Sequence, residues 1–410
     1  MRLRIDITQS RRTLFNKFLL LLVTGSISLF IIICRSNLFI GVIQPIGQYL
    51  DGTKSIDSRV TDERPIKKIF VWNSPHRIEV ASFGKGQRAF IDAECEVSDC
   101  ALYVNSSRLW SSVVRSDYRL LENFDAVLVN VHELPYSFVP PISIGRYKRS
   151  EEQRFIFFTQ ESPVSMSLNL AQLDGLFNWT MSYKMDSDVL LLYGRVKKLD
   201  RPSSDPVRSM KDVIKRKRKQ VAWMVSHCET SIRREDYVAE LQKYIDVDVY
   251  GKCGKLRCPR NETHWISHPK CYKRLATEYK FYLAFENSIC NDYVTEKLFS
   301  ILQHDIVPVV LGGADYTRIA PPHSFIDARQ FEGPKQLADY LKRLDADDGL
   351  YAEYFEWKKD YKVEAGFEQM ARHAFCDLCS KLHRDESVKY YTSLAPFWSV
   401  ETQCSNNSII

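Results

Sequence analysis

Unbroken runs of apolar residues constrain the fold of this chain more than any other feature. Residues 67–73 (KKIFVWN), 124–134 (FDAVLVNVHEL) and 154–163 (RFIFFTQESP) each contain several consecutive apolar side chains. A strand that is covered on both faces has this pattern, as in a parallel sheet packed between helices. The first half of the chain is therefore predicted to form a parallel sheet.

A second series of strands and helices follows residue 219. Strand-like and helix-like stretches alternate there in the order 220–228, 234–245, 247–251, 271–280, 281–288, 292–305 and 306–313. Such alternation is typical of a parallel sheet with helices on both sides. A length of 410 residues also exceeds a single core, so we expect an α/β protein of two domains with a ligand site between them, at the carboxyl ends of the strands.

Shifts in composition mark the expected boundaries. Residues 200–219 are rich in proline, serine and charge, which is typical of a linker. The expected organisation is a cytosolic tail at 1–17, a membrane-spanning signal-anchor at 18–34, a stem at 35–64, an N-terminal α/β domain at 65–205, a linker at 206–219, a C-terminal α/β domain at 220–370 and a cysteine-rich segment at 371–410.

The apolar run at 18–34 carries no charge and is flanked by Lys17 and Arg35. Its length is near the lower limit for a helix that spans a membrane. Cations outnumber acids before it, which predicts a cytosolic amino terminus and a lumenal remainder, a type II topology. The alternative is a cleaved signal peptide, but the run is longer than the usual apolar region and no clear small-residue cleavage site follows it.

Ten of the eleven cysteines lie beyond this run, as do glycosylation sequons at Asn105, Asn178, Asn261 and Asn406. We expect several disulfides in an oxidising lumen, with a pairing that the sequence does not reveal. The net charge is only +6, and part of it comes from the amino-terminal tail and from the KRKRK run at 215–219. This run could be a nuclear signal or a solvated linker; the lumenal topology favours the linker, and nucleic-acid binding is not expected.

The densest polar constellation lies between residues 281 and 299, FYLAFENSICNDYVTEKLF. A buried strand ends there and a helix begins, and the polar side chains around the turn are Glu286, Asn287, Ser288, Thr295, Glu296 and Lys297. A helix amino terminus with a lysine beside it can bind an anion such as a diphosphate. A capped helix with a surface Glu–Lys pair is the alternative interpretation.

This segment, with IVPVVLGG, APPHSFID and LDADDGLYAEYFEWKKD after it, closely resembles the signature region of the α1,3-fucosyltransferase family. The resemblance covers residues 154–194 and 220–380. It implies a GT-B-type glycosyltransferase fold of two facing Rossmann-like domains, with the acceptor on the N-terminal half and GDP-fucose on the C-terminal half. It also implies transfer of L-fucose from GDP-β-L-fucose to O3 of a GlcNAc residue with inversion. No cofactor is then required, and a divalent cation is at most stimulatory.

By the same resemblance, Lys297 contacts the donor diphosphate and Glu296 contacts sugar hydroxyls. The other residues expected in the donor pocket are Tyr293, Thr295, Glu286, Asn287 and Ser288. Arg234, in SHCETSIRREDYVAEL, matches a helix-borne arginine that clamps the diphosphate, a task suited to the planar guanidinium. Arg233 remains an alternative. The family often has Asn-Trp where this chain has His227 and Cys228, which affects the shape of the guanosine side.

FFTQESPVSM resembles the family segment whose glutamate is the general base, and Glu161 is the matching residue. Taken without the resemblance, a glutamate before Ser-Pro is a turn residue. Two segments have the residue types and spacing of metal sites. One is an Asp-x-Asp site in MDSD at 185–188, and the other is a zinc site of His373, Cys376, Cys379 and His383. Cationic side chains can neutralise a leaving diphosphate and disulfides suit a lumenal Cys-x-x-Cys, so no metal is predicted.

The segment YGKCGKLRCPR, with Cys253 and Cys258, most resembles the subgroup that modifies the core GlcNAc of N-glycans. The Lewis-type subgroup, which acts on outer lactosamine GlcNAc, is the alternative. A non-catalytic glycan-binding relative is a third reading, but Glu161, Arg234 and Lys297 are all present. We therefore expect a single-pass enzyme of the Golgi membrane that uses GDP-fucose and an N-glycan acceptor.

Overall fold

The computed structural model describes residues 64–73, 77–104, 118–134, 149–166, 168–202, 210–258 and 269–405. Its contacts divide the chain into two units, 1–63 and 64–410. The expected tail, apolar span and stem lie outside the described residues, and so do the sequons at Asn105, Asn261 and Asn406. Among the helices that the structure describes, none has the length and apolar character needed to cross a bilayer.

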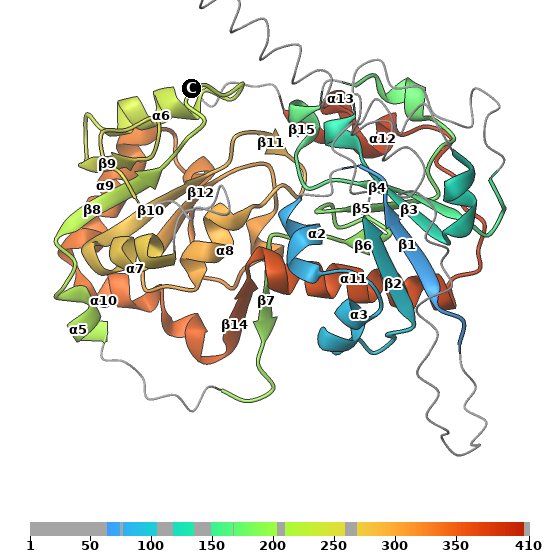
Figure 1. Cartoon of the computed structure of the whole chain (residues 1–410). Coiled ribbons are helices and arrows are strands. Elements are labelled where there is room, and N and C mark those ends of the chain that lie inside the picture. The colour runs from blue at the N-terminus through green and yellow to red at the C-terminus, as the bar shows by residue number, and fades with distance from the viewer. Residues whose placement is uncertain are drawn as a thin grey trace, which may run out of the picture. The chain divides into compact units, whose positions relative to one another are not determined.

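The first sheet has, within the described residues, six strands in the order β2-β1-β3-β4-β5-β6, all paired in parallel (Figure 1). Their bounds are β1 Lys67–Val71, β2 Cys100–Val104, β3 Ala126–Asn130, β4 Arg154–Phe158, β5 Trp179–Ser182 and β6 Val189–Leu190. Every residue of β3 and β4 is buried. The apolar runs are thus covered on both faces, which confirms the predicted parallel sheet.

Short helices connect these strands. Their bounds are α2 Ile78–Phe83, α3 Arg88–Asp92, η1 Tyr118–Asn123, η2 Val131–Glu133, η4 Pro163–Ser165 and η5 Leu170–Leu173. The 3-10 helices η2 and η4 follow the carboxyl ends of β3 and β4 closely. This edge of the sheet therefore carries short, sharply turned segments and the side chains that they position.

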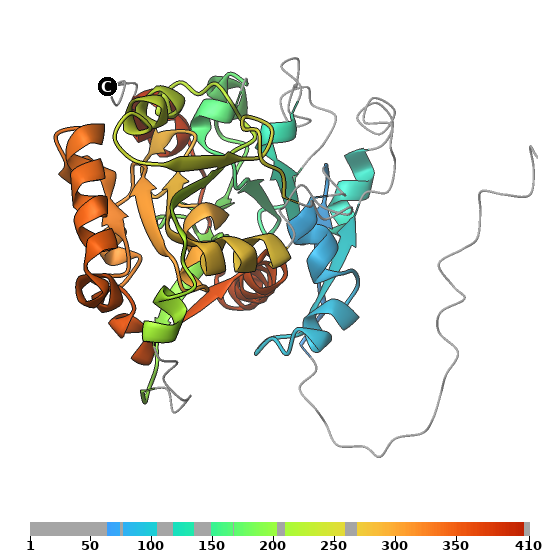
Figure 2. The same cartoon turned by 90° about the vertical axis from the view of Figure 1, so that its left-hand side faces the viewer.

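The second sheet is also parallel, with the order β13-β12-β10-β8-β9 in the part of the chain that the structure describes. Its strands are β8 Lys219–Met224, β9 Val247–Tyr250, β10 Tyr279–Phe285, β12 Val307–Leu311 and β13 Ile326–Asp327. The helices are α5 Met210–Ile214, α6 Arg234–Leu241, α7 Pro269–Glu278, α8 Glu296–Leu302, α9 Pro334–Ala346 and α10 Asp348–Glu353. Helices α6 and α9 share one core with the sheet, and α7 and α8 share another on its other face (Figure 2). The predicted α/β alternation is confirmed.

The chain leaves and re-enters the first half through a two-stranded antiparallel ribbon. Strand β7 Gly194–Lys198 pairs with β14 Tyr361–Ala365, and the short helix η8 Glu356–Lys359 precedes β14. Helix α11 Phe367–Arg384 then packs on α2 and on the core of the first sheet. The remaining elements are η6 Tyr316–Arg318, η7 Ala328–Gln330, α12 Ala395–Trp398, α13 Val400–Gln403, and β15 Cys404–Ser405 paired with β11 Ile289–Cys290. The carboxyl-terminal segment, predicted only as cysteine-rich, thus packs on the first half through α11 and reaches the second half through β15.

Ten cysteines form five disulfides among the described residues, as expected for a chain in an oxidising compartment. The pairs are Cys95–Cys376, Cys100–Cys379, Cys228–Cys253, Cys258–Cys271 and Cys290–Cys404. The first joins α11 to the segment between α3 and β2, and the second joins α11 to the start of β2, across sequence separations of 281 and 279. Cross-links that close such long loops restrict the unfolded chain most.

The sequon at Asn178 has a structural role instead of a glycan. Asn178 is fully buried. Its Oδ1 accepts a hydrogen bond from the Phe155 amide at 2.8 Å, and its Nδ2 donates to the Lys389 carbonyl at 2.9 Å. A glycan on this nitrogen would break both the burial and the bonds, so Asn178 is excluded as a glycosylation site in the folded protein.

The charged run at 215–219 is only partly the solvated linker that its composition predicts. Lys215 and Arg216 are exposed, but Lys217 is 8% exposed. Its Nζ donates to the carbonyls of Ala276, Tyr279 and Asp305 at 2.5, 2.9 and 2.5 Å. The expectation of a solvated side chain is therefore wrong at Lys217, because its ammonium reaches the carbonyl groups of Ala276 in α7, Tyr279 at the start of β10 and Asp305 after α8 together.

We predict that Lys217→Met lowers the free energy of unfolding by roughly 3 kcal/mol, since it leaves buried carbonyl groups without donors. The neighbouring exposed change Lys215→Met should shift it by less than about 0.5 kcal/mol. Urea unfolding of the two variants beside the wild type measures both values. Equal losses in the two variants would show that Lys217 contributes no more than a surface lysine.

Candidate functional site

The carboxyl ends of strands from both sheets meet through a hydrogen bond between two serines. Ser162 follows β4 by four residues, and Ser288 follows β10 by three. The Ser288 hydroxyl donates to the Ser162 hydroxyl at 2.9 Å, and both residues are 1% exposed. This junction places Glu161, from the first sheet, beside the Glu286–Asn287–Ser288 turn of the second.

Glu286 is the centre of a buried polar network at the end of β10. It is 1% exposed, and its carboxylate accepts hydrogen bonds from the Thr295 amide at 2.8 Å and from the Thr295 hydroxyl at 2.9 and 3.0 Å. Lys297 Nζ adds an ion pair at 2.9 Å. Burial raises the pKa of Glu286, and the Lys297 charge opposes that rise. The network ties the end of the strand to the start of α8.

Lys297 stands at the first turn of α8 with its ammonium fixed by three oxygens. Besides Glu286, its Nζ donates to the Thr295 hydroxyl at 2.7 Å and lies 3.6 Å from a Glu296 oxygen. Burial opposes its charge, but the Glu286 and Glu296 carboxylates outweigh burial and raise the pKa of Lys297. Thr295 is the N-cap of α8, not part of its first turn, and the helix has only seven residues. At so short a helix, the full charge of the lysine would attract an anion more strongly than the helix dipole would.

Arg234, the first residue of α6, lies beside the same network. It is 3% exposed, and its guanidinium donates to the carbonyls of Phe285 at 2.5 Å and His227 at 3.2 Å. Its buried Nε has no hydrogen-bond partner among the described residues. Burial lowers the pKa of Arg234 and the Glu286 carboxylate opposes that change. Arg233 is exposed and pairs with Asp236 at 2.5 Å, so the inward arginine is Arg234.

Glu161 is half-buried, and its carboxylate makes no hydrogen bond or ion pair with the part of the chain that the structure describes. The turn residue that follows, Ser162, is the N-cap of η4, and Glu161 does not cap it. The interpretation of Glu161 as a simple turn cap therefore has no contact to support it. A carboxylate at a strand end that has no partner among the described residues is available to a ligand.

Three tyrosines surround the junction, of which the sequence predicted only Tyr293. The Tyr293 ring lies 4.9 Å from that of Tyr183 and 6.4 Å from that of Tyr193. Burial, together with the Glu161 charge, raises the pKa of Tyr293 and of Tyr193. Glu161 thus acts electrostatically on the residue that the resemblance assigns to the donor. Tyr183 and Tyr193 were missed because nothing distinguishes them in sequence from core tyrosines.

An ion pair at the start of α2, between half-buried Arg77 and buried Glu79, was also missed. Arg77 donates to Glu79 through Nε at 3.1 Å and Nη2 at 3.0 Å, and Glu79 is 1% exposed. Burial opposes the Arg77 charge, but Glu79 and Glu161 outweigh burial and raise the pKa of Arg77. The signal available in the sequence was a pair of opposite charges just after a strand, at the edge where the other site residues lie.

Two adjacent glycines after β12 let the strand end approach the same turn. A Cβ on Gly313 would lie 2.5 Å from the Cys290 carbonyl oxygen, and one on Gly312 would lie 2.4 Å from the Tyr316 hydroxyl.

Asn287, between Glu286 and Ser288, has a buried Oδ1 without a hydrogen-bond partner among the described residues. The structure therefore brings together Glu161, Arg234, Glu286, Asn287, Ser288, Tyr293, Thr295, Glu296 and Lys297.

The Asp-x-Asp segment at 185–188 is occupied by protein contacts. Asp188 accepts hydrogen bonds from the Thr180 amide, the Tyr391 hydroxyl and the Lys389 ammonium at 2.9, 2.9 and 2.8 Å. Asp186 is exposed and lies 3.4 Å from Lys184 Nζ. Asp188 therefore holds residues 389–391 against β5. Both of its carboxylate oxygens accept hydrogen bonds from protein groups, which is not the arrangement of an open metal ligand.

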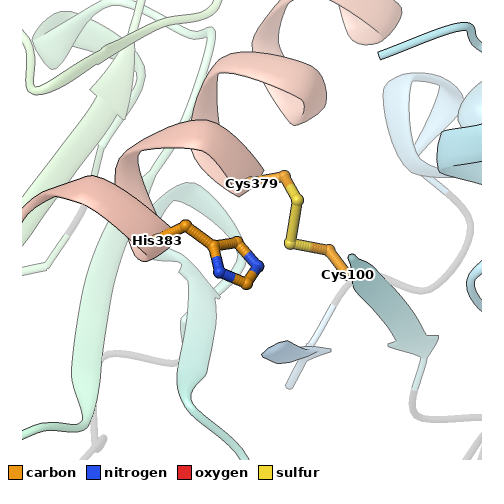
Figure 3. Close-up of side chains that lie close together, drawn as sticks. All are labelled: Cys100, Cys379 and His383. Atoms are coloured by element: carbon orange, nitrogen blue, oxygen red, sulfur yellow. A yellow bond between two sulfur atoms is a disulfide. The ribbon is translucent and has the colours of Figure 1, made fainter. Parts of the chain in front are cut away.

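The cysteines of the proposed zinc set are bonded to other cysteines. Cys376 pairs with Cys95 and Cys379 with Cys100. Ligand atoms of Cys100, Cys379 and His383 lie within 4.8 Å of one another, but the two sulfurs share a bond (Figure 3). Because zinc binds thiolates, this group cannot take zinc in the disulfide form. The absence of a metal requirement stays a prediction.

Two family models match the chain. The model described as "Fucosyltransferase, N-terminal" matches residues 64–194, and "Glycosyltransferase family 10 (fucosyltransferase) C-term" matches residues 214–397. A solved structure titled "Crystal Structure of alpha1,3-Fucosyltransferase" is 16% identical with a TM-score of 0.48, over 82% of this chain and 95% of that one.

Several relatives are similar over long stretches. "Alpha-(1,3)-fucosyltransferase C" of Drosophila melanogaster is 38% identical over 68% of this chain and 66% of its own length. "Glycoprotein 3-alpha-L-fucosyltransferase A" of the same fly is 34% identical over 79% of this chain and 59% of its own length. The human "4-galactosyl-N-acetylglucosaminide 3-alpha-L-fucosyltransferase FUT5" is 32% identical, covering 87% of this chain and 86% of its own. The chain thus spans less than two thirds of the length of the fly relatives that it matches.

The Glu286–Lys297 pair generates a pH-dependent prediction. The raised pKa of Glu286 means that folding takes up a proton between the ordinary value of 4.5 and the raised value. The stabilisation that protonated Glu286 gives to the folded state is therefore complete below pH 4.5 and is lost as the pH rises through the raised pKa of Glu286. Lys297→Met removes the cation that limits the rise, and we expect it to lower the free energy of unfolding by about 3–5 kcal/mol at pH 8 and by less at pH 5.

Urea unfolding at both pH values measures the effect. The double variant Glu286→Gln/Lys297→Met is the control, because it has no buried carboxylate left to protonate. Its loss relative to wild type should not grow between pH 5 and pH 8. A single variant that is equally destabilised at both values would show that the Glu286 carboxylate does not depend on Lys297.

Proposed function

Because the chain belongs to glycosyltransferase family 10, the fucosyltransferases, we propose that it transfers L-fucose from GDP-β-L-fucose to O3 of a GlcNAc residue in glycoprotein glycans. The observation that carries the proposal is the junction of Ser162 and Ser288. It sets Glu161, whose carboxylate has no partner among the described residues, beside the turn that follows β10, and Arg234 at the start of α6 and Lys297 at the start of α8 lie next to that turn. A base and two cations at adjoining strand ends are what displacement of a diphosphate by a sugar hydroxyl needs.

The two cations would stabilise the leaving GDP. Lys297 Nζ has donated two hydrogen bonds, to Glu286 and Thr295, and keeps one proton for a phosphate oxygen. Arg234 is held by two carbonyls and keeps its Nε proton without a partner in the described structure. Cations fixed in place before the reaction stabilise developing negative charge without reorganisation. Tyr293, Thr295, Glu296, Asn287 and Ser288 would complete the donor pocket, with Glu296 at the sugar hydroxyls.

Glu161 would act as general base. Transfer from a β-linked donor to an α-linked product inverts the anomeric carbon, so we propose a single displacement without a fucosyl-enzyme. Inverting glycosidases use the same principle, because a carboxylate on the side opposite the leaving group removes the proton from the attacking oxygen. Glu161 follows β4 in the first half while Arg234 and Lys297 belong to the second. A residue of the first half would therefore accept the proton, and residues of the second half would stabilise the leaving group.

We propose the core GlcNAc of an N-glycan as the acceptor. The segment with Cys253 and Cys258 that resembles the core-modifying subgroup is held by the disulfides Cys228–Cys253 and Cys258–Cys271. The first of these adjoins His227, whose carbonyl positions Arg234. Relatives named for glycoprotein and for galactosyl-GlcNAc acceptors have similar identities, 34% and 32%, so the acceptor must be decided by assay.

The proposal includes the setting in which this activity takes place. Five disulfides among the described residues fit an oxidising compartment. We propose a single-pass type II protein of the Golgi membrane with its catalytic part in the lumen. Because Arg234 and Lys297 would supply two cations for the diphosphate, we propose that no cofactor is required and that a divalent cation is at most stimulatory.

The acceptor is tested by incubating the purified protein with GDP-fucose and either an N-glycan core glycopeptide or N-acetyllactosamine. We expect fucose on the Asn-linked GlcNAc, with a preference over lactosamine of at least about tenfold in kcat/KM, or ~1.4 kcal/mol. Mass spectrometry and NMR of the product give the site and the linkage. Preference for lactosamine would identify the Lewis type, and glycan binding without transfer to either would identify a non-catalytic relative.

Glu161→Gln tests the base. Glutamine keeps the size of the side chain but cannot accept the proton, so we expect normal folding, near-normal GDP-fucose binding and a fall in kcat of about 10²–10⁴-fold. Asp186→Asn, an exposed carboxylate after β5, should leave kcat unchanged and is the matched control. If the glutamine variant retains more than about a tenth of wild-type kcat, another group accepts the proton.

A further inference from the structure

Residues 394–405, here called the tail clamp, cross between the two halves next to the donor turn. The segment comprises Leu394, α12, α13 and β15. Its start is fixed to the first half, where the Leu394 amide donates to Asp174 at 2.9 Å. Its end pairs with the second half, because β15 lies antiparallel to β11, with Cys290 opposite Cys404 and Ile289 opposite Ser405. The Cys290–Cys404 disulfide makes this pairing covalent.

Gln403 connects both halves through one side chain. It is buried, and its Oε1 accepts from Lys184 Nζ of the first half at 2.6 Å and from Asn291 Nδ2 of the second at 3.4 Å. Its backbone carbonyl accepts from the Asn291 amide at 2.8 Å, and its Nε2 donates to Pro396 at 2.8 Å. Lys184 is 4% exposed, so Gln403 supplies an acceptor for a buried ammonium at the same time as it holds Asn291.

Aromatic packing runs parallel to these polar contacts. Trp398 of the tail clamp lies 5.3 Å from Tyr183, which lies 4.9 Å from Tyr293. All three rings are buried. Tyr293 precedes the N-cap of α8 by two residues. The tail clamp therefore contacts residues 289–293 at one end and supports the ring of Tyr293 through Tyr183 at the other.

The part of the turn that the tail clamp holds is the part with an unusual backbone. Residues 289–293 join the Glu286 network to the N-cap of α8, and Asp292 has φ +59°, in the left-handed region. Its Oδ2 accepts from the Met185 amide of the first half at 3.1 Å. Contacts from outside the second sheet thus hold a conformation that a non-glycine residue seldom adopts.

We propose that the tail clamp, through Gln403 and the Cys290–Cys404 disulfide, is a positioning element of the donor site. It holds residues 289–293 in the conformation that places Tyr293, Thr295 and Lys297 for the nucleotide diphosphate before that ligand arrives. This inference rests on the proposed function. If the turn has its binding-competent conformation only a fraction f of the time, the apparent Kd is the intrinsic Kd divided by f. Release of the tail clamp lowers f and therefore raises the donor Kd.

The test uses two variants of the full-length protein. Gln403→Leu keeps every disulfide and removes the shared acceptor, whereas Cys290→Ser/Cys404→Ser removes the covalent link. If release leaves the turn competent about a tenth of the time, the GDP Kd by calorimetry and the GDP-fucose KM both rise about tenfold. We expect kcat at saturating donor to change by less than about threefold, because the bound turn is the same. The acceptor KM should not change.

Two controls separate positioning from general stability. Cys100→Ser/Cys379→Ser removes a disulfide at the start of β2, at the opposite end of the strand from the site. It should lower the melting temperature and leave the GDP Kd unchanged. Glu401→Gln alters an exposed side chain of α13 and should change neither.

The outcomes distinguish this inference from the function on which it rests. Wild-type protein that neither binds GDP nor transfers fucose contradicts the proposed function. Wild-type protein that does both, with tail-clamp variants that lose only melting temperature and keep the GDP Kd and donor KM, contradicts the positioning role alone.

Discussion

The buried carboxylate of Glu286 is the interaction on which the donor side of this structure depends. A carboxylate at the end of a buried strand is costly to desolvate unless hydrogen bonds and a cation compensate it. Thr295 and Lys297 do both, and in doing so they fix the start of α8 to the end of β10. The same contacts hold the Lys297 ammonium at the strand edge. Satisfying one buried charge therefore also positions the cation that we propose for the diphosphate.

The second constraint is that the two halves are joined at that edge rather than only by their connecting strands. The hydroxyls of Ser162 and Ser288, the Met185 amide with Asp292, and the disulfide of Cys290 with Cys404 all link the first half to one turn of the second. The carboxyl ends of parallel strands carry the binding residues in α/β folds. Here these joints bring the ends of β4 and β10 together, and the proposed reaction, which uses both Glu161 and Lys297, depends on that arrangement.

How far the sequence could predict this arrangement differs between its parts. The buried strands β3, β4, β10 and β12 were evident because their apolar runs have no alternation, and the Glu286–Lys297 segment stood out as a long polar motif. The choice of Arg234 over Arg233 required the structure, since adjacent arginines differ only in which one faces the carbonyls of Phe285 and His227. The burial of Asn178 and Lys217, the disulfide pairing and the return of α11 to the first half depend on contacts between residues far apart in the chain. Local composition carries no record of such contacts.

In the proposed reaction, Glu161 from the first half acts together with Arg234 and Lys297 from the second. A crystal structure of the protein with GDP and an N-glycan acceptor would show whether these three side chains meet the same substrates. We expect a Glu161 carboxylate oxygen within hydrogen-bond reach of the acceptor O3, about 2.6–3.2 Å, with the diphosphate contacted by Arg234 and Lys297. A complex in which the diphosphate lies away from those cations, or in which a different carboxylate approaches O3, would contradict the account.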